Sequence, residues 1–314
     1  MPNKLIIRIS NELGNQMFMY ASALGISHTL KRELLVDNET AYSSKKNISK
    51  YGLNNYKITS EIAPKDLKFL GMTGYIKRKL IKKINLFNSN KNFYIEKRDK
   101  DKITKFDNIL TTTKFCSNVY LEGYFETEKY FTNIRDLILK EFSFKDKEKY
   151  TTSPYFAKIN ETNSVSICLR QNRFIEGKSS LNSVNNLKNS IIFANEQILY
   201  INKAINYFKN LISKPTFFLW SNDVVNINLN LFNEKIYLIN HDKNFCSNID
   251  KRTLDLFLIS SCNNHIVTPS SFNWWGAWLS TKKNKIILRP SDKNFSLFKV
   301  NNKDLWPSDW IEID

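Results

Sequence analysis

Three short polar segments in the second half of the chain have residue types suited to a phosphate-bearing ligand. Arg170 and Arg173 follow an apolar run, and a guanidinium group can hold two phosphate oxygens in a fixed fork. Ser270 and Ser271 precede a segment with helical spacing, where N–H groups and the positive end of the helix dipole would face an anion. The same residues also fit simpler roles, because arginines are common on surfaces and Ser270 suits an ordinary helix N-cap.

Two aspartates complete this set of candidates. Asp223 ends the polar segment 221–223, which follows another apolar run. Asp255 lies in a segment with helical spacing, from which its carboxylate could accept hydrogen bonds from paired donors such as those of guanine. The alternative for Asp255 is a solvated carboxylate or an ion pair with Lys251 or Arg252. The residues alone leave both interpretations open.

Other catalytic chemistries find little support in the sequence. Asp99 and Asp101 have the D-x-D spacing of a metal site, but they lie in a lysine-rich segment instead of following an apolar strand, so we expect no metal. The histidines have no nucleophile elbow nearby, which argues against hydrolase chemistry; they are His28, His241 and His265. The four cysteines show no C-x-x-C spacing, so neither a zinc site nor a disulfide framework is expected.

The candidate residues follow apolar runs that alternate with helical segments, a pattern typical of a parallel sheet covered by helices. Near the start, a strand at 4–10, a helix over 17–28 and a strand at 34–37 predict a βαβ unit. The second half predicts strands at 165–169, 216–221, 235–240, 265–268 and 285–289, with helices near 196–210 and 250–262 and from about 271. In such a sheet, ligands bind beyond the carboxyl ends of the strands, where the candidate residues lie.

Length and composition favour two α/β domains. With 314 residues and 42% hydrophobic content, the chain can bury a substantial core. The charged and polar segment 145–152 is a reasonable linker, so we expect domains at 1–150 and 151–314. Neither a signal peptide nor a run of about 20 apolar residues is evident, and we therefore expect a cytoplasmic protein.

The net charge of +17 predicts anionic partners, among which nucleic acid, a membrane surface and a nucleotide sugar all qualify. A basic stretch places Ile76, Leu80, Ile84 and Phe87 on one face of a helix, and its lysines could contact an anionic bilayer. The alternative is a helix that is solvated or faces an acceptor. We expect no nucleic-acid partner, because the lysines are dispersed and accompany no known binding motif.

Three segments of the chain carry a family resemblance. Residues 13–21 read LGNQMFMYA, residues 120–125 and 128–131 read YLEGYF and EKYF, and residues 265–279 read HIVTPSSFNWWGAWL. Together they resemble glycosyltransferase family 11, the α-1,2-fucosyltransferases that build bacterial surface polysaccharides. The resemblance runs nearly end to end and implies a GT-B fold, with two facing Rossmann-like domains. In such enzymes the C-terminal domain holds GDP-fucose and the N-terminal domain approaches the acceptor.

The resemblance also implies residue roles. Arg170 matches the first arginine of the family's HxRRGD motif, which holds the diphosphate, and Asp255 matches the carboxylate that reads guanine. Asn15 would lie near the leaving group, on the opposite domain. The donor-binding set is then Arg170, Arg173, Asp223, Asp255, Ser270, Ser271 and Phe272. The catalytic set is Arg170, Asn15 and Glu126.

This chain departs from the family pattern at two places. Residues 168–174 read CLRQNRF where the family has HxRRGDY, so a role that rests on the missing aspartate does not transfer. Arg173 either restores the lost positive charge or marks a subgroup with another acceptor or 6-deoxysugar donor. Glu126 replaces a glutamine and is a candidate general base.

The resemblance implies an inverting, metal-independent transfer of L-fucose from GDP-β-L-fucose to the 2-hydroxyl of a galactoside, in surface polysaccharide or O-antigen synthesis. The partners would be the GDP-sugar and an oligosaccharide or lipid-linked glycan. No cofactor is expected, because preorganised positive charge around the departing phosphate drives such a reaction. The alternatives are a related GDP-6-deoxysugar donor, an inactive sugar-binding protein and, in a different class, a basic nucleic-acid-binding protein.

Overall fold

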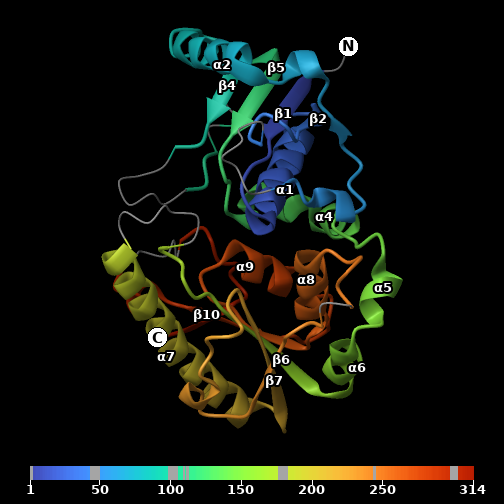
Figure 1. Cartoon of the computed structure of the whole chain (residues 1–314). Helices are drawn as coiled ribbons and strands as arrows, with labels where there is room; N and C mark the ends of the chain where they lie inside the picture. The colour runs from blue at the N-terminus through green and yellow to red at the C-terminus, as the bar shows by residue number, and fades with distance from the viewer. Residues whose placement is uncertain are drawn as a thin grey trace. The chain divides into compact units, whose positions relative to one another are not determined.

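The computed structural model describes residues 3–42, 50–97, 105–108, 110, 113–175, 183–242, 245–297 and 303–314, and the chain divides into two compact units. The N-terminal unit comprises Met1–Lys145 and Lys303–Leu305, and the C-terminal unit comprises Asp146–Asn302 and Trp306–Asp314. Figure 1 labels most of the helices and strands of both units. The sequence-based boundary between 150 and 151 falls inside the short helix α5 (Lys147–Thr151). This helix belongs to the C-terminal unit, where the ring of Tyr150 packs 5.5 Å from that of Phe257.

The N-terminal unit is built on a parallel sheet with strand order β3-β2-β1-β5-β4. Its strands are β1 (Lys4–Arg8), β2 (Glu33–Asp37), β3 (Glu61–Ile62), β4 (Lys91–Ile95) and β5 (Phe115–Glu122). Aliphatic and aromatic side chains suit such a buried pleated surface, and the core cluster on this sheet contains Ile6, Leu35, Ala63, Phe93 and Tyr120. The predicted βαβ opening is confirmed, because β1 and β2 pair in parallel and are joined by a helix.

Helix α1 (Leu13–Thr29) is buried over most of its length and circumference. A glycine permits its close packing, since a Cβ added at Gly25 would lie 1.9 Å from the carbonyl oxygen of Tyr130. The other helices are α2 (Gly71–Asn85) and α4 (Arg135–Glu141), with 3-10 turns η1 (Leu53–Asn55), η2 (Lys65–Leu67), η3 (Glu128–Tyr130) and η4 (Thr132–Ile134).

A late segment of the chain completes the N-terminal unit. Residues 303–305 return to it from the C-terminal unit. The carboxylate of Asp304 accepts a hydrogen bond from Nζ of Lys129 at 2.5 Å and another from the backbone N–H of Phe106 at 3.3 Å. The carboxylate is almost fully buried, so these bonds anchor the segment in the unit.

The C-terminal unit carries a second parallel sheet, with strand order β11-β10-β9-β6-β7-β8. Its strands are β6 (Asn163–Leu169), β7 (Pro215–Ser221), β8 (Ile236–Leu238), β9 (Asn264–Ile266), β10 (Ile287–Pro290) and β11 (Ile311–Ile313). Besides α5, the unit contains the helices α6 (Pro154–Glu161), α7 (Ser183–Leu211), α8 (Lys251–Ser261) and α9 (Ser271–Trp278), with 3-10 turns η6 (Leu229–Leu231) and η7 (Asp292–Asn294). The predicted alternation of strands and helices is confirmed.

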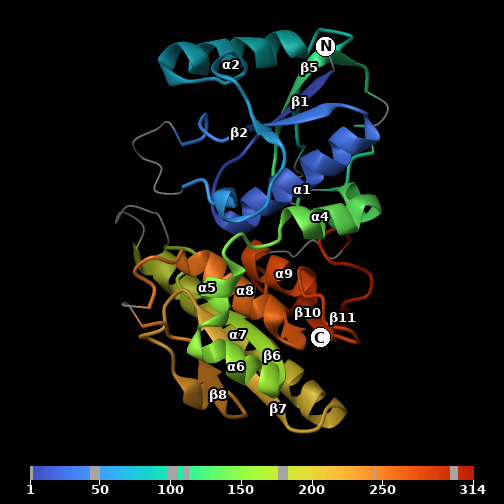
Figure 2. The same ribbon diagram turned by 90° about the vertical axis from the view of Figure 1, so that its right-hand side faces the viewer.

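Two groups of helices pack on this second sheet. Helix α7 buries Ile201, Ile205 and Phe208 against side chains of β6 and β7. Helices α8 and α9 lie side by side (Figure 2), and Gly276 of α9 permits their close approach, because a Cβ there would be 2.3 Å from the side chain of Ile259. The sequence places the short helix α9 directly after β9, so its N-terminus is held at the carboxyl end of the sheet.

Candidate active site

The carboxyl ends of β6, β7 and β9 bring the predicted donor-binding segments to one edge of the C-terminal sheet. Strand β6 pairs in parallel with both β7 and β9, so the three strands end at the same edge. Arg170 directly follows β6, Asp223 lies two residues after β7, and Ser270 begins the turn into α9. This is the edge at which ligands bind in open α/β sheets.

The loop after β6 is fixed from both sides by amide side chains. Gln197 of α7, fully buried, accepts a hydrogen bond from the backbone N–H of Arg170 at 3.2 Å and donates one to its carbonyl at 2.8 Å. Asn222 does the same for Gln171, accepting from its N–H at 2.7 Å and donating to its carbonyl at 2.8 Å. These four hydrogen bonds hold the backbone at Arg170 and Gln171. Sequence reasoning did not identify Gln197, whose signal is only a polar residue among the apolar residues of a helix.

The family departures at 171 and 172 have structural roles. Asn172 has a positive φ of 56°, a conformation that asparagine tolerates better than most residues. Its Nδ2 donates to Oδ2 of Asp223 at 3.2 Å, and Nε2 of Gln171 donates to the carbonyl of Asp223 at 2.6 Å. The hydrogen bond from Asn226 is the main cause that holds the pKa of Asp223 below its ordinary value. Asp223 thus joins the loops that follow β6 and β7.

Arg173 connects the loop after β6 with the turn after β9. Its Nη1 donates to the carbonyl of Pro269 at 3.1 Å, and its guanidinium lies over the ring of Phe193 at 5.2 Å. The structure therefore places the positive charge of Arg173 beside the turn that leads into α9. This is the pairing of charge and helix N-terminus that favours an anion.

The side chain of Thr268 helps to organise the turn into α9. The buried hydroxyl of Thr268 donates to the carbonyl of Cys168 at 2.9 Å and accepts from Nδ2 of Asn273 at 3.1 Å. Ser270 occupies the N-cap position in an extended conformation, but its side chain makes no capping hydrogen bond within the described part of the chain. Ser271 and Phe272 form the first turn of α9 and are half-buried.

Asn273 is a second residue of this turn that sequence reasoning missed. Its side chain is almost fully buried, and its Oδ1 has no hydrogen-bond partner among the described residues. The sequence signal was present, because an asparagine stands between a phenylalanine and two tryptophans in a motif already singled out.

Asp255 lies next to a histidine that the sequence analysis did not connect with it. Oδ1 of Asp255 and Nε2 of His241 are 2.7 Å apart, and the histidine side chain is buried while the carboxylate is partly exposed. The edge of the Tyr155 ring meets the His241 ring at 5.6 Å. Arg252, one of the alternative partners considered from the sequence, pairs with Asp250 at 3.0 Å. The contact with the buried imidazole restrains the carboxylate of Asp255.

The two predicted residues of the N-terminal unit lie on neighbouring segments. Asn15 is half-buried in the first turn of α1, while the adjacent Gln16 is fully buried and fastens that turn to the loop at 50–52 with bonds of 2.8 Å. Asn11, which precedes the helix, donates from Nδ2 to the hydroxyl of Tyr124 at 2.7 Å. This bond brings the start of α1 next to the turn that carries Glu126.

The turn at 123–126 is held by a buried carboxylate. Glu96 accepts hydrogen bonds from the backbone N–H groups of Tyr124 at 2.7 Å and Phe125 at 2.8 Å. Phe125 has a positive φ of 52°, and its carbonyl accepts from Oγ of Ser22 at 2.9 Å. Successive N–H groups in such a conformation form a small anion-binding nest. Glu96 fills it and so fixes the backbone that presents Glu126.

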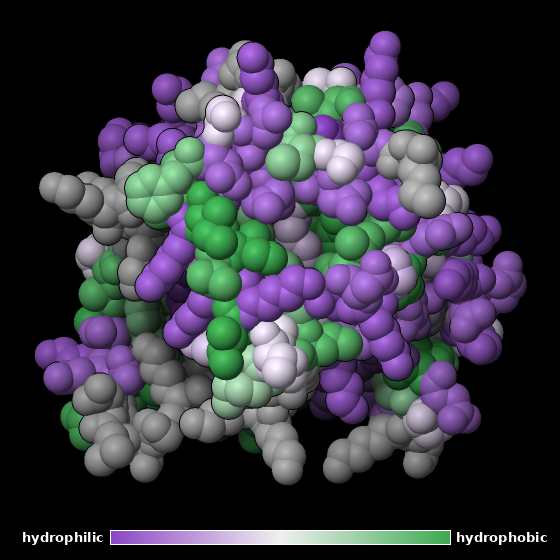
Figure 3. All heavy atoms as spheres, turned by 90° about the horizontal axis from the view of Figure 1, so that it is seen from above, coloured by the Kyte–Doolittle hydropathy of each residue, from purple (hydrophilic) through white to green (hydrophobic). Residues whose placement is uncertain are grey.

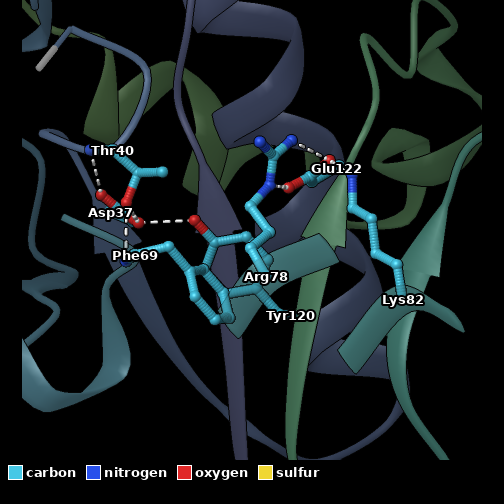
Figure 4. Close-up of polar contacts among 7 residues, drawn as sticks. All are labelled: Asp37, Thr40, Phe69, Arg78, Lys82, Tyr120 and Glu122. Carbon is cyan, nitrogen blue, oxygen red and sulfur yellow. Dashed lines mark hydrogen bonds and ion pairs between the residues drawn. The ribbon is translucent and has the colours of Figure 1, made fainter. Parts of the chain in front are cut away.

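Glu122, the acidic residue of the YLEGYF motif, forms ion pairs with two basic side chains. Figure 4 shows Glu122 between Arg78 and Lys82. Nη2 of Arg78 donates to Oε2 of Glu122 at 2.6 Å. In the same view, the hydroxyl of Tyr120 donates to Oδ2 of Asp37 at 2.5 Å. Burial opposes ionisation of Glu122, but the hydrogen bonds from Arg78 and Lys82 hold its pKa below the ordinary value. Glu122 thus connects α2 to the end of β5.

The remaining sequence predictions concern metals and membranes. Asp99 and Asp101 lie outside the described residues. Among those that are described, no group of three or more His, Cys, Asp or Glu side chains could hold a metal ion. Within the same part of the chain, no helix is long and apolar enough to cross a bilayer.

Comparison with known proteins agrees with the two-sheet architecture. The family model for glycosyl transferase family 11 matches residues 3–314. The O-antigen biosynthesis glycosyltransferase WbnK of Escherichia coli is 26% identical, over 97% of this chain and 99% of its own. An α-1,2-colitosyltransferase of Escherichia coli is 24% identical over 99% of each chain. The crystal structure of the α-1,6-fucosyltransferase NodZ soaked with GDP-fucose has a TM-score of 0.52 at 13% identity, covering 89% of this chain and 93% of its own. The fold is therefore of the GT-B type.

Proposed function

This chain belongs to glycosyl transferase family 11, and we propose that it transfers L-fucose from GDP-β-L-fucose, with inversion, to the 2-hydroxyl of a galactoside in surface polysaccharide synthesis. The observation that carries the proposal is the edge formed by Arg170, Arg173 and the N-terminus of α9, which gathers positive charge where a diphosphate would lie. The similarity to an O-antigen glycosyltransferase and to an α-1,2-colitosyltransferase supports the linkage and the pathway class.

In the proposed reaction, the acceptor oxygen bonds to the anomeric carbon as the bond from that carbon to the phosphate oxygen breaks. Negative charge grows on the departing GDP, and Arg170, Arg173 and the N–H groups of α9 stabilise it. The acceptor proton passes to a base, for which Glu126 is the candidate. In this scheme, protein groups stabilise the charge on the departing GDP, and no metal ion is needed.

Asp255 and His241 form the proposed guanine-reading pair. A carboxylate can accept from both N–H donors on the guanine edge, and the 2.7 Å contact with the buried imidazole fixes its orientation. Asp223 contributes indirectly in this proposal, because its hydrogen bonds already join two loops. Ser270, Ser271 and Phe272 would contact the phosphates through the turn that they form.

A related deoxysugar donor is the second candidate. Residues 171–173 differ from the family pattern, and one relative is named a colitosyltransferase. Presenting GDP-fucose and GDP-colitose to the protein with a terminal β-galactoside, followed by mass spectrometry of the product, separates the two. Transfer in the presence of a chelator would agree with the metal-free scheme, and complete loss that added Mg²⁺ or Mn²⁺ restores would contradict it.

Arg170→Ala tests the phosphate site. We expect kcat to fall about 100- to 1,000-fold, the usual effect of removing one group that stabilises developing charge. The matched control is Arg252→Ala, which removes an arginine of the same unit that pairs with Asp250. Equal activity of the two variants would remove Arg170 from the mechanism.

His241→Ala and Asp255→Asn test the guanine pair by calorimetry with GDP. Each change removes a hydrogen bond to a charged group, worth about 1.5–3 kcal/mol, so GDP affinity should fall roughly 10- to 100-fold. Affinity for inorganic pyrophosphate should stay the same, because the phosphates lie elsewhere in the site. An unchanged GDP affinity in Asp255→Asn would contradict guanine recognition by this residue.

A further inference from the structure

Helix α2 (Gly71–Asn85) turns the polar side chains of Arg78, Lys82 and Asn85 inward. Arg78 and Lys82 point to the buried Glu122, as Figure 4 shows. Asn85 donates from Nδ2 to the carbonyl of Phe93 at 2.7 Å and accepts from the backbone N–H of Asn92 at 2.9 Å. These polar contacts fix the rotation of the helix about its axis.

The opposite side of α2 carries large apolar side chains into solvent. The exposed fractions of these residues lie between 48% and 88%; they are Met72, Ile76, Leu80 and Ile84 of α2 and Phe87 in the turn that follows it. Their spacing of four, four, four and three residues places them on one side of a helix. Figure 3 shows apolar side chains, in green, gathered on this end of the molecule beside hydrophilic ones in purple. A surface helix of a soluble protein normally shows the reverse arrangement.

The surroundings of this apolar face are basic. The segment 67–95 contains no aspartate or glutamate. Lys77, Lys79 and Lys83 are exposed on α2 itself, and Nζ of Lys79 lies over the ring of Tyr75 at 4.5 Å. An apolar face bordered by lysines is the composition of helices that lie in the interface of an anionic bilayer.

We propose that α2 docks the protein on an anionic lipid surface, with the apolar face inserted among the acyl chains and the three lysines at the level of the headgroup phosphates. A second copy of this chain fits the face less well, because a two-fold contact through α2 would bring Lys77, Lys79 and Lys83 toward their own counterparts without any acid on the helix to compensate. The proposal does not depend on the identity of the sugar donor or acceptor.

The inward contacts of Arg78 and Lys82 keep the apolar face of α2 exposed to solvent. To bury the apolar residues against its own sheet, α2 would have to rotate and break the bonds of Arg78 and Lys82 with Glu122, leaving a buried carboxylate unpaired. The helix is therefore held in the docking orientation before it meets a membrane.

Flotation of the full chain with phospholipid vesicles tests the proposal. Vesicles of equal parts phosphatidylglycerol and phosphatidylcholine should bind the protein, and vesicles of phosphatidylcholine alone should bind it at least about 100-fold more weakly, because each lysine near an anionic surface contributes about a fivefold factor. Lys77→Gln, Lys79→Gln and Lys83→Gln together should lower binding to the anionic vesicles by the same factor. The control changes three exposed lysines elsewhere: Lys57→Gln, Lys145→Gln and Lys147→Gln.

The apolar contribution is tested by the combined variant Ile76→Gln, Leu80→Gln and Ile84→Gln. The inner side of α2 is untouched, so thermal unfolding should be unchanged or improved while vesicle binding falls about 100-fold or more. The matched control replaces exposed apolar residues of α7: Val184→Gln, Ile191→Gln and Leu199→Gln.

Three results would overturn the proposal. One is the absence of binding to anionic vesicles by the unmodified protein. Another is equal loss of binding in the α2 variants and their controls. The third is a concentration-dependent dimer in sedimentation equilibrium that only the α2 apolar variant abolishes, without vesicle binding, which would assign the face to a second copy. Because no donor or acceptor is present, none of these outcomes bears on the proposed transfer reaction.

Discussion

Replacing Glu96 by alanine should loosen the turn at 123–126 far more than the loss of one surface charge would. The carboxylate accepts two backbone hydrogen bonds, at 2.7 and 2.8 Å, and the residue is almost fully buried. Hydrogen bonds to a charged group contribute about 1.5–3 kcal/mol each, and their loss leaves the N–H groups of Tyr124 and Phe125 without an acceptor. Phe125 is also held at a positive φ, which costs of order 1 kcal/mol in a residue other than glycine. The local loss should reach about 3–5 kcal/mol.

Hydrogen exchange measured by mass spectrometry reports this loss where it occurs. In Glu96→Ala the amides of residues 124 and 125 should exchange at least about 100-fold faster, since each 1.4 kcal/mol is a factor of ten. Glu96→Gln should lie between this variant and the unmodified protein, because the amide oxygen can still accept one bond. The control Glu61→Gln, an exposed glutamate of the same unit, should change nothing.

Two outcomes would refute the reasoning. Unchanged exchange at 124 and 125 in Glu96→Ala would mean that the carboxylate does not hold the turn. Fast exchange at full transferase activity would mean that Glu96 does hold the turn but that this turn does not position Glu126 for catalysis.

Further predictions concern pH and packing. Burial lowers the pKa of His265 to about 3. The unfolded chain takes up a proton below about pH 6.5 that the folded chain does not, so this residue removes about 2 kcal/mol of stability between pH 7 and pH 5. Urea unfolding of His265→Gln should show a correspondingly weaker loss over that range, and an identical loss would contradict the assignment. Gly25→Ala should destabilise the protein by about 1–3 kcal/mol despite the better helix propensity of alanine, because the new Cβ would meet the carbonyl of Tyr130; a raised melting temperature would show that the backbone yields.

The sequence predicted the architecture where the apolar runs were long and buried. Strand β7 was visible because parallel strands covered on both faces have nearly continuous apolar sequences, and β6 was visible from the apolar residues of its second half, VSICL. Strand β4 was missed: KNFYI is short and polar at its start, and it becomes a strand through its pairing with the buried β5. Helix α7 begins at Ser183, well before the predicted start at 196. The prediction began too late because the first turns of the helix contain asparagine and lysine, and their apolar residues do not recur at a clear helical spacing.

The sequence indicated candidate residues for the site but not the contacts that they make. Strand ends and the family motifs indicated Arg170, Arg173 and the turn at 270. The long-range pairs were not accessible, since 27 residues separate Arg170 from Gln197, and nothing in the sequence spacing connects His241 with Asp255.

The return of residues 303–305 to the N-terminal unit has a consequence for synthesis on the ribosome. Asp304, the acceptor for Lys129 and for the backbone of residue 106, is translated after almost the whole of the C-terminal unit. The N-terminal unit emerges first from the ribosome, but one of its buried carboxylates is synthesised only when the C-terminal unit is nearly complete. Maturation of the two units is thereby ordered in time, and a nascent chain stalled before this point would display an N-terminal unit that lacks one of its internal anchors.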